Sequence, residues 1–150
     1  MDEGFDPWFS MTLAEAAAGR LAPFAVQRRS DSGYVGCTCY LDIVSRHRRI
    51  EIGGTWYHPD SWATQVNPEC KLLLMQHAFE VLGVQRVGFV TDVLNTRSQA
   101  AIEKLGATRE GVLRAHMVAQ GGRVRDSVVF SIVAAEWPRV KERLERRLGR

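Results

Sequence analysis

The residues with the clearest chemical potential lie where a predicted strand runs into a predicted helix. Gly53-Gly54 falls in a segment rich in strand-forming residues, and a polar loop then leads to Asn67-Pro68-Glu69, a strong helix start. A helix N-terminus presents free N–H groups and the positive end of the helix dipole, so this junction could bind an anion such as a phosphate. Many helices begin with the same residues and bind nothing, so the junction alone does not define a site.

The elements that must position this junction follow from hydrophobic periodicity and turn residues. We expect a helix over 11–20, strands over 21–29, 34–45 and 50–57, a helix over 67–82, a strand over 86–92, a helix over 96–105, strands over 109–119 and 124–135, and a helix from Trp137 onward. An antiparallel front half is thus followed by helix-linked strands. This order predicts a mixed α/β fold in a single domain covering residues 1–150.

Local signals fix several boundaries of these elements. Thr12 with Glu15 has the spacing of a capping box, and Asn67 and Asn95 are expected to cap the two central helices. Residues 120–123, Gln-Gly-Gly-Arg, predict a tight hairpin turn between the last two strands. Pro138 stands in the first turn of the final helix, where a proline is tolerated.

Composition narrows the class of protein. The 150 residues are 45% hydrophobic and 25% charged, which excludes a disordered tail, a fibre and a coiled coil. No apolar run reaches the length of a membrane span, and the acidic start is unlike a signal peptide, so we expect a cytoplasmic protein with no membrane partner. The net charge of +3 comes largely from a basic C-terminal helix, in which Glu142 can pair with Arg146 and Lys141 with Glu145.

The cysteines predict neither a disulfide framework nor a metal centre. There are three of them, Cys37, Cys39 and Cys70, and an odd count argues against paired bridges. None of the four histidines has a metal-ligand spacing with them. We therefore expect reduced structural thiols and no metal site.

One pattern in the second half is specific enough to indicate a family. Asp92-x-x-Asn95-x-x-Ser98 is followed by Leu105-Gly106-Ala107-x-x-Glu110-Gly111, and the match continues through Arg125-Asp126-Ser127-Val128 to Trp137-Pro138. Over roughly residues 19–140 the chain resembles the GCN5-related N-acetyltransferase (GNAT) family. More narrowly it is similar to the RimJ/RimL type, named for acetylation of ribosomal-protein N-termini.

The resemblance implies both a fold and a reaction. Two central parallel strands, here 50–57 and 86–92, should splay apart, with helices on both faces of the sheet. The pantetheine arm of acetyl-CoA should lie in the gap, and an acetyl group should pass to a primary amine of a protein N-terminus or a small molecule. The resemblance also implies that this chain lacks the usual first strand and helix, which leaves the acceptor side open or completed by a second subunit as a homodimer.

The same resemblance assigns roles to residues. Glu51 matches a general-base glutamate, and Ser98 matches the group that protonates the departing thiol. Backbone N–H groups near Gly53 could polarise the thioester carbonyl. His116, on a late strand, is a further candidate base. The expected cofactor-binding residues are Thr55, Trp56, Trp62, Ala63, Thr64, Gln65, Val66, Asn67, Asn95 and Ser98.

Two departures from the family pattern leave alternatives open. The phosphate loop usually carries glycines, but Trp62, Gln65 and Asn67 stand at the aligned positions, and Ile102 replaces a tyrosine acid found in many members. The first alternative is therefore a non-catalytic acyl-CoA-binding module of the same fold. The second is a ribosome- or nucleic-acid-associated module that uses the basic C-terminal helix, although no aromatic stacking pattern accompanies that helix.

Overall fold

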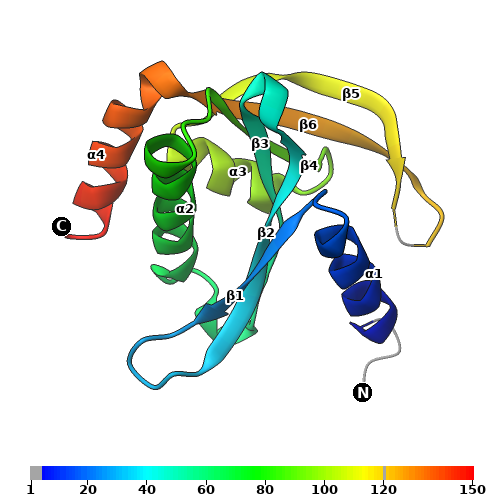
Figure 1. The fold of residues 1–150 in the computed structure, drawn as a ribbon, viewed down its shortest axis with the longest axis horizontal. Coiled ribbons are helices and arrows are strands. Elements are labelled where there is room, and N and C mark those ends of the chain that lie inside the picture. The colour runs from blue at the N-terminus through cyan, green and yellow to red at the C-terminus, as the bar shows by residue number, and fades with distance from the viewer. Residues whose placement is uncertain (1–4, 120) are drawn as a thin grey trace.

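A computed structural model of the chain describes residues 5–119 and 121–150 (Figure 1). Its helices are α1 (Phe5–Ala17), α2 (Val66–Gln76), α3 (Thr96–Leu105) and α4 (Trp137–Arg147). Its strands are β1 (Ala22–Gln27), β2 (Tyr34–Val44), β3 (Arg49–Tyr57), β4 (Arg86–Asp92), β5 (Thr108–Val118) and β6 (Val124–Val133). The mixed α/β fold expected from the sequence is confirmed, and every predicted element is present.

The strands form one sheet in the order β1-β2-β3-β4-β6-β5. All neighbours are antiparallel except β3 and β4, which are parallel. This central pair is joined only over Arg49↔Arg86, Ile50↔Val87 and Glu51↔Gly88. Beyond Glu51 the two strands separate, as the family resemblance implied.

Helices lie on both sides of the sheet (Figure 1). α2 and α4 lie together on one side, and α1 lies on the other side of β1–β3. The side chains most completely buried between the sheet and its helices are Phe89, Phe130, Leu72, Met75, Ile132, Leu144, Val87 and Val128. On α4 the spacing of Trp137, Val140 and Leu144 places one apolar stripe on this core, which explains why so basic a helix is anchored there.

The N-terminal boundary differs from the prediction. α1 includes residues from Phe5 onward, with Pro7 in its first turns, where a proline is tolerated. Thr12 therefore lies inside the helix, and its hydroxyl donates to the carbonyl of Trp8 at 2.8 Å. The predicted capping box was wrong, and Glu15 instead forms an ion pair with Arg20.

The start of α2 also differs from the prediction, whereas that of α3 does not. Gln65 is the N-cap of α2 and makes no side-chain cap bond, so Asn67 lies in the first turn rather than at the cap. α2 continues into a π-helical turn over His77–Val81. The Asn95 cap of α3 is confirmed, because its side-chain oxygen accepts the Ser98 N–H at 3.0 Å.

The connection between the last two strands and the start of the last helix agree with the predictions made from glycine and proline. The predicted turn over 120–123 includes Gln120, which lies outside the described residues, but Gly121 and Gly122 both adopt positive φ. α4 starts at Trp137 with Pro138 in its first positions, as expected. Arg146 pairs with Glu142 at 3.3 Å, whereas Lys141 pairs with Glu80 of the π-helical turn at 2.8 Å rather than with Glu145.

Cysteine and membrane findings complete the description. Cys37, Cys39 and Cys70 are free thiols. Within the described part of the chain, no cluster of three or more histidine, cysteine or acidic side chains could hold a metal ion. No helix in the same part is both long and apolar enough to cross a membrane.

Candidate active site

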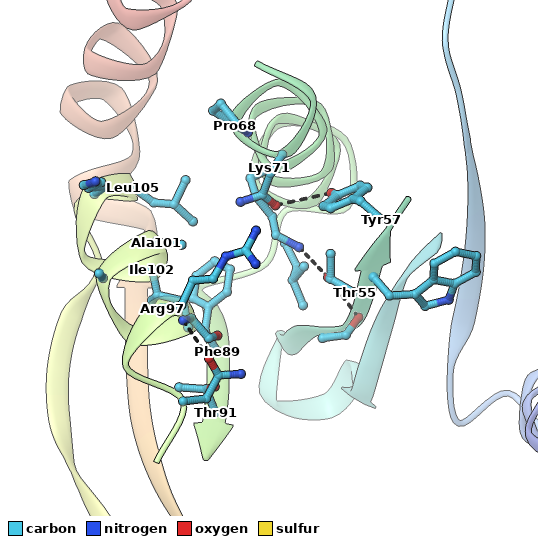
Figure 2. Close-up of a pocket in the computed structure, with 18 of the residues that line it drawn as sticks. Thr55, Tyr57, Pro68, Lys71, Phe89, Thr91, Arg97, Ala101, Ile102 and Leu105 are labelled. Atoms are coloured by element: carbon cyan, nitrogen blue, oxygen red, sulfur yellow. Dashed lines mark hydrogen bonds between the residues drawn. The ribbon is translucent and has the colours of Figure 1, made fainter. Parts of the chain in front are cut away.

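A cleft of about 860 Å³ opens where β3 and β4 separate (Figure 2). The C-terminal half of β3 and the start of α2 form one wall, and β4 with α3 forms the other. Trp8 of α1 and Trp56 of β3 also line the cleft. The separation of the two central strands thus produces a site that both halves of the sheet contribute to.

A β-bulge shapes the β3 wall. Cys37 and Cys39 of β2 pair with Trp56 and Gly53, so one residue of β2 faces two residues of β3. The extra residue falls at Gly54, which has φ +55°, a conformation that glycine adopts without strain. A bulge leaves backbone groups without a ladder partner, so this stretch has N–H groups available to a ligand.

The charged side chains that line the cleft are all basic. They are Lys71, Arg97, Lys104 and Arg147. Among the residues that the structure describes, no aspartate or glutamate lines the same cleft. The remaining lining is apolar or neutral, so the cleft is suited to a ligand that combines several negative charges with an uncharged arm.

Lys71 is the most buried of these cations. Its residue surface is 6% exposed, and its Nζ donates to the hydroxyls of Thr55 at 2.7 Å and Thr38 at 3.3 Å (Figure 2). Burial lowers the pKa of this lysine to about 8, while the neighbouring thiols of Cys70 and Cys39 act in the opposite direction.

Arg97 connects the two walls. Its guanidinium carbon lies 4.4 Å from the centre of the Trp62 ring, which is a cation–π contact between α3 and the loop that precedes α2. The same arginine points into the cleft from α3 (Figure 2). A side chain in this position can bridge the walls or contact a bound anion.

The loop before α2 has the conformation that a glycine would favour, although it contains none. Ala63 has φ +59°, in the left-handed region. Trp62 Nε1 donates to the carbonyl of Tyr57 at 2.9 Å, and the Thr64 hydroxyl donates to the carbonyl of Ser61 at 2.7 Å. These bonds hold the loop in place at the N-terminus of α2.

Glu51 lies beside the cleft rather than among its lining residues. It is the last residue of β3 that pairs with β4, and its Oε1 would lie 3.2 Å from a Cβ placed on Gly53. Burial raises the pKa of Glu51 to about 7, and Asp42 adds to the rise, whereas Arg125 and Arg49 oppose it. A carboxyl group of this kind is suited to proton transfer near neutral pH.

The structure gathers most of the expected site residues but not all of them. Thr55, Trp56, Trp62, Ala63, Thr64, Asn67, Asn95 and Ser98 line the cleft. Gln65 and Val66 do not, and His116 is exposed on β5, also outside the lining. Ile102 lines the cleft as an apolar residue.

Sequence reasoning missed the four cations of the cleft. One signal could have identified Lys71: it lies on the same helical stripe as Leu74, Met75 and Ala78, which are buried, so a lysine interrupts an apolar face. Arg97, Lys104 and Arg147 carried no comparable signal, because basic residues on helices are usually solvated.

Comparisons with known proteins agree with this geometry. The sequence model of the acetyltransferase (GNAT) domain matches residues 2–108. The uncharacterized N-acetyltransferase YoaA of Bacillus subtilis is 32% identical over 110 residues, which are 73% of this chain and 61% of that protein. The chain thus spans less than two thirds of the length of this relative.

Solved structures are similar over almost the whole chain. A GCN5-related N-acetyltransferase from Brucella melitensis is 31% identical, with a TM-score of 0.84 over 92% of this chain and 62% of its own. Mycobacterium smegmatis RimJ, solved in complex with CoA-disulfide, is 25% identical, with a TM-score of 0.80 over 95% of this chain and 68% of its own. The splayed sheet, the basic cleft and the matched domain lead to one conclusion: the chain belongs to the GNAT family of acetyltransferase domains.

Proposed function

We propose that this chain is an N-acetyltransferase that transfers the acetyl group of acetyl-CoA to a primary amine of a protein N-terminus or a small molecule. The observation that carries the proposal is the cleft between β3 and β4, whose charged lining is entirely basic among the described residues. The three phosphate groups and the uncharged pantetheine arm of CoA are complementary to that lining in charge and polarity. The similarity to RimJ, which was solved with a CoA derivative, supports the same ligand class.

In this proposal the loop and the helix start bind the phosphates. Backbone N–H groups within residues 62–67, at the positive end of α2, would donate hydrogen bonds to the pyrophosphate, and Arg97 would add a positive charge. Asn95 would bind the pantetheine arm through its side-chain nitrogen, because its oxygen is occupied by the Ser98 N–H. The sequence-based cofactor-binding roles of Thr55, Trp56 and Ser98 remain part of this proposal, and each of these residues lines the cleft.

The chemistry would take place where the central strands part. Glu51 would accept the proton of the attacking amine, since its raised pKa of about 7 lets it act as a base near neutral pH. The bulge at Gly54 would supply backbone N–H groups to the oxygen that becomes negative as the amine attacks. Trp8 and Trp56 line the same cleft and would contact the incoming amine.

Calorimetry with acetyl-CoA, CoA and ATP is the first test. We expect acetyl-CoA and CoA to bind and ATP to bind far more weakly, because ATP lacks the arm that fills the gap between the strands. The absence of binding by acetyl-CoA and CoA would contradict the proposal.

Turnover separates an enzyme from a binding module. With saturating acetyl-CoA and a panel of peptides, polyamines, aminoglycosides and small amines, CoA release should depend on the amine. Glu51→Gln should lower kcat by roughly 10²–10⁴-fold while leaving CoA binding intact, because general-base catalysis contributes about that much. Binding without amine-dependent turnover would instead support the non-catalytic module, which the apolar Ile102 and the glycine-poor loop favour.

The proposal includes a homodimer. β5 is an edge strand and exposes apolar side chains, among them Leu113, Met117 and Val118. Light scattering over a range of concentrations should show a species of twice the monomer mass. A constant monomer mass would remove this part of the proposal.

A further inference from the structure

Lys71 is a buried cation without a carboxylate partner. Its Nζ contacts the hydroxyls of Thr55 and Thr38, which lie 2.8 Å from each other, and no ion pair joins it to an acidic side chain in the described part of the chain. Hydroxyl groups solvate an ammonium group but do not neutralise it. A buried charge of this kind is costly for the fold, so its presence in a binding cleft indicates a functional role.

The other titratable groups around this lysine do not supply a negative charge. Cys70 precedes it on α2, and Cys39 follows Thr38 on β2. Burial is the main reason that the pKa of each thiol is raised, in Cys39 to about 11, so both stay neutral near pH 7. From α3 the charged groups that line the cleft are Arg97 and Lys104, both of them cations, and Arg97 points into it (Figure 2). The negative charge that Lys71 is positioned to meet must therefore come from a ligand.

The position of Lys71 identifies which part of the ligand that is. Its partner Thr55 follows Gly54, the centre of the bulge, so the ammonium is held at the level of the strand where the thioester carbonyl would be bound. Across the cleft at this level, α3 presents Ala101, Ile102 and Leu105, none of which can donate a proton (Figure 2). The pyrophosphate, by contrast, would lie a full helical turn away, at the start of α2.

We propose that Lys71 is the acid that stabilises and protonates the departing CoA sulfur, an inference that rests on the proposed function. The amine nitrogen bonds to the thioester carbon, and its proton passes to Glu51. The carbon–sulfur bond breaks with both electrons going to sulfur, which takes a proton from Lys71 Nζ. CoA leaves as the thiol, the neutral lysine regains a proton from solvent, and Glu51 releases its proton to solvent.

The test needs no acceptor amine, because it measures the ionisation of bound CoA. The pH is varied over a complex with saturating CoA, and thiolate formation is followed by ultraviolet absorbance. The same complex with desulfo-CoA is subtracted, which removes the signal of the three cysteines and the tyrosines. We expect the bound thiol to ionise at a pH about one unit or more below that of free CoA, as an adjacent cation causes.

Three variants assign the shift to one group. Lys71→Met should abolish it while desulfo-CoA still binds within about threefold of the wild-type affinity, since the lost contact is to sulfur. Lys104→Met, which removes another cation of the cleft, should weaken binding but keep the shift. Ser98→Ala should also keep it, whereas loss of the shift in this variant would transfer the role to Ser98 and overturn the proposal.

The remaining outcomes are equally decisive. A shift that survives in Lys71→Met, or no shift in the wild-type complex, would overturn the inference and leave the proposed function standing. Failure of CoA to bind the wild-type protein would instead overturn the proposed function and this inference together. Should Lys71→Met not fold, Thr55→Val replaces it: removing the acceptor that positions Nζ should reduce the shift, and an unchanged shift would count against the role.

Discussion

At the scale of single residues, the main feature is the burial of a carboxyl group beside the cleft. Glu51 has its pKa raised to about 7, chiefly because it is buried and also because Asp42 lies near it. The sequence resemblance could assign a role to Glu51, but its burial could not be predicted. Its cross-strand neighbour is Leu41 of β2, and this pairing depends on the irregular register of β2 and β3, which no local sequence pattern indicates.

This burial predicts an unusual dependence of stability on pH. The folded protein binds a proton at Glu51 more tightly than the unfolded chain does, so wild-type stability should fall as pH rises from about 4.5 to 7 and above. Glu51→Gln has no such loss, and at pH 8 we expect it to be more stable than the wild type by on the order of 2 kcal/mol. At pH 5 the difference should nearly vanish.

Urea unfolding at pH 5 and pH 8 measures this difference. Glu103→Gln is the matched control, because it removes the charge of an exposed glutamate on α3. We expect the control to have a small effect of similar size at both pH values. A stability gain for Glu51→Gln that is no larger at pH 8 than at pH 5 would contradict the burial argument.

At the scale of elements, the β-bulge at Gly54 of β3 determines the positions of Thr55 and of the backbone N–H groups beside it. Gly54 has φ +55°, and a Cβ on it would lie 3.3 Å from Cys39 Sγ. Gly54→Ala should therefore destabilise the protein by about 1–2 kcal/mol. It should also weaken acetyl-CoA binding, because the bulge positions Thr55 and the free N–H groups.

Gly111→Ala provides the control for this substitution. Gly111 lies on β5, and a Cβ placed on it would meet nothing within 4 Å. Thermal unfolding should show little loss of stability, or a small gain, for the control. Equal losses in the two variants would show that Gly54 has no special conformational role.

The starts of the helices show which structural boundaries a local sequence pattern is sufficient to predict. The Asn95 cap and the Pro138 start follow local chemistry, and both were predicted correctly. The start of α2 was not, because the loop bonds made by Trp62 and Thr64 let the helix begin at Val66, ahead of the polar Asn67. The bulge was also missed, since it exists only as a mismatch in register between two strands.

At the scale of the whole molecule, the basic residues of the cleft come from separate parts of the chain. Lys71 lies on α2, Arg97 and Lys104 on α3, and Arg147 at the end of α4. Hydrophobic periodicity and turn residues predicted the order of elements, and the family resemblance implied the splayed strands. It could not predict this convergence of charge, because no local pattern connects the four positions.

The convergence predicts that cofactor binding depends on salt. Acetyl-CoA affinity should fall as ionic strength rises, because the exposed cations are screened. Arg97→Gln should lower the affinity at low salt by roughly 10-fold, the worth of a charge-assisted hydrogen bond, and should flatten the salt dependence.

Calorimetry at two or more salt concentrations provides this measurement. Arg29→Gln, in the exposed turn after β1, changes the net charge equally without touching the cleft, and it should behave as the wild type. An affinity that does not respond to salt, or equal effects of the two substitutions, would contradict the assignment of the cleft as an anion site.

The short junction between β3 and β4 has a mechanical consequence. Within the sheet, three residue pairs at one end join the β1-β2-β3 half to the β4-β6-β5 half, so relative motion of the halves would pivot near this junction. A ligand that fills the cleft would act as a spacer and stiffen this hinge. Amide hydrogen exchange should then slow in β3 and β4 together, whereas exchange in the edge strands β1 and β5 should remain unchanged.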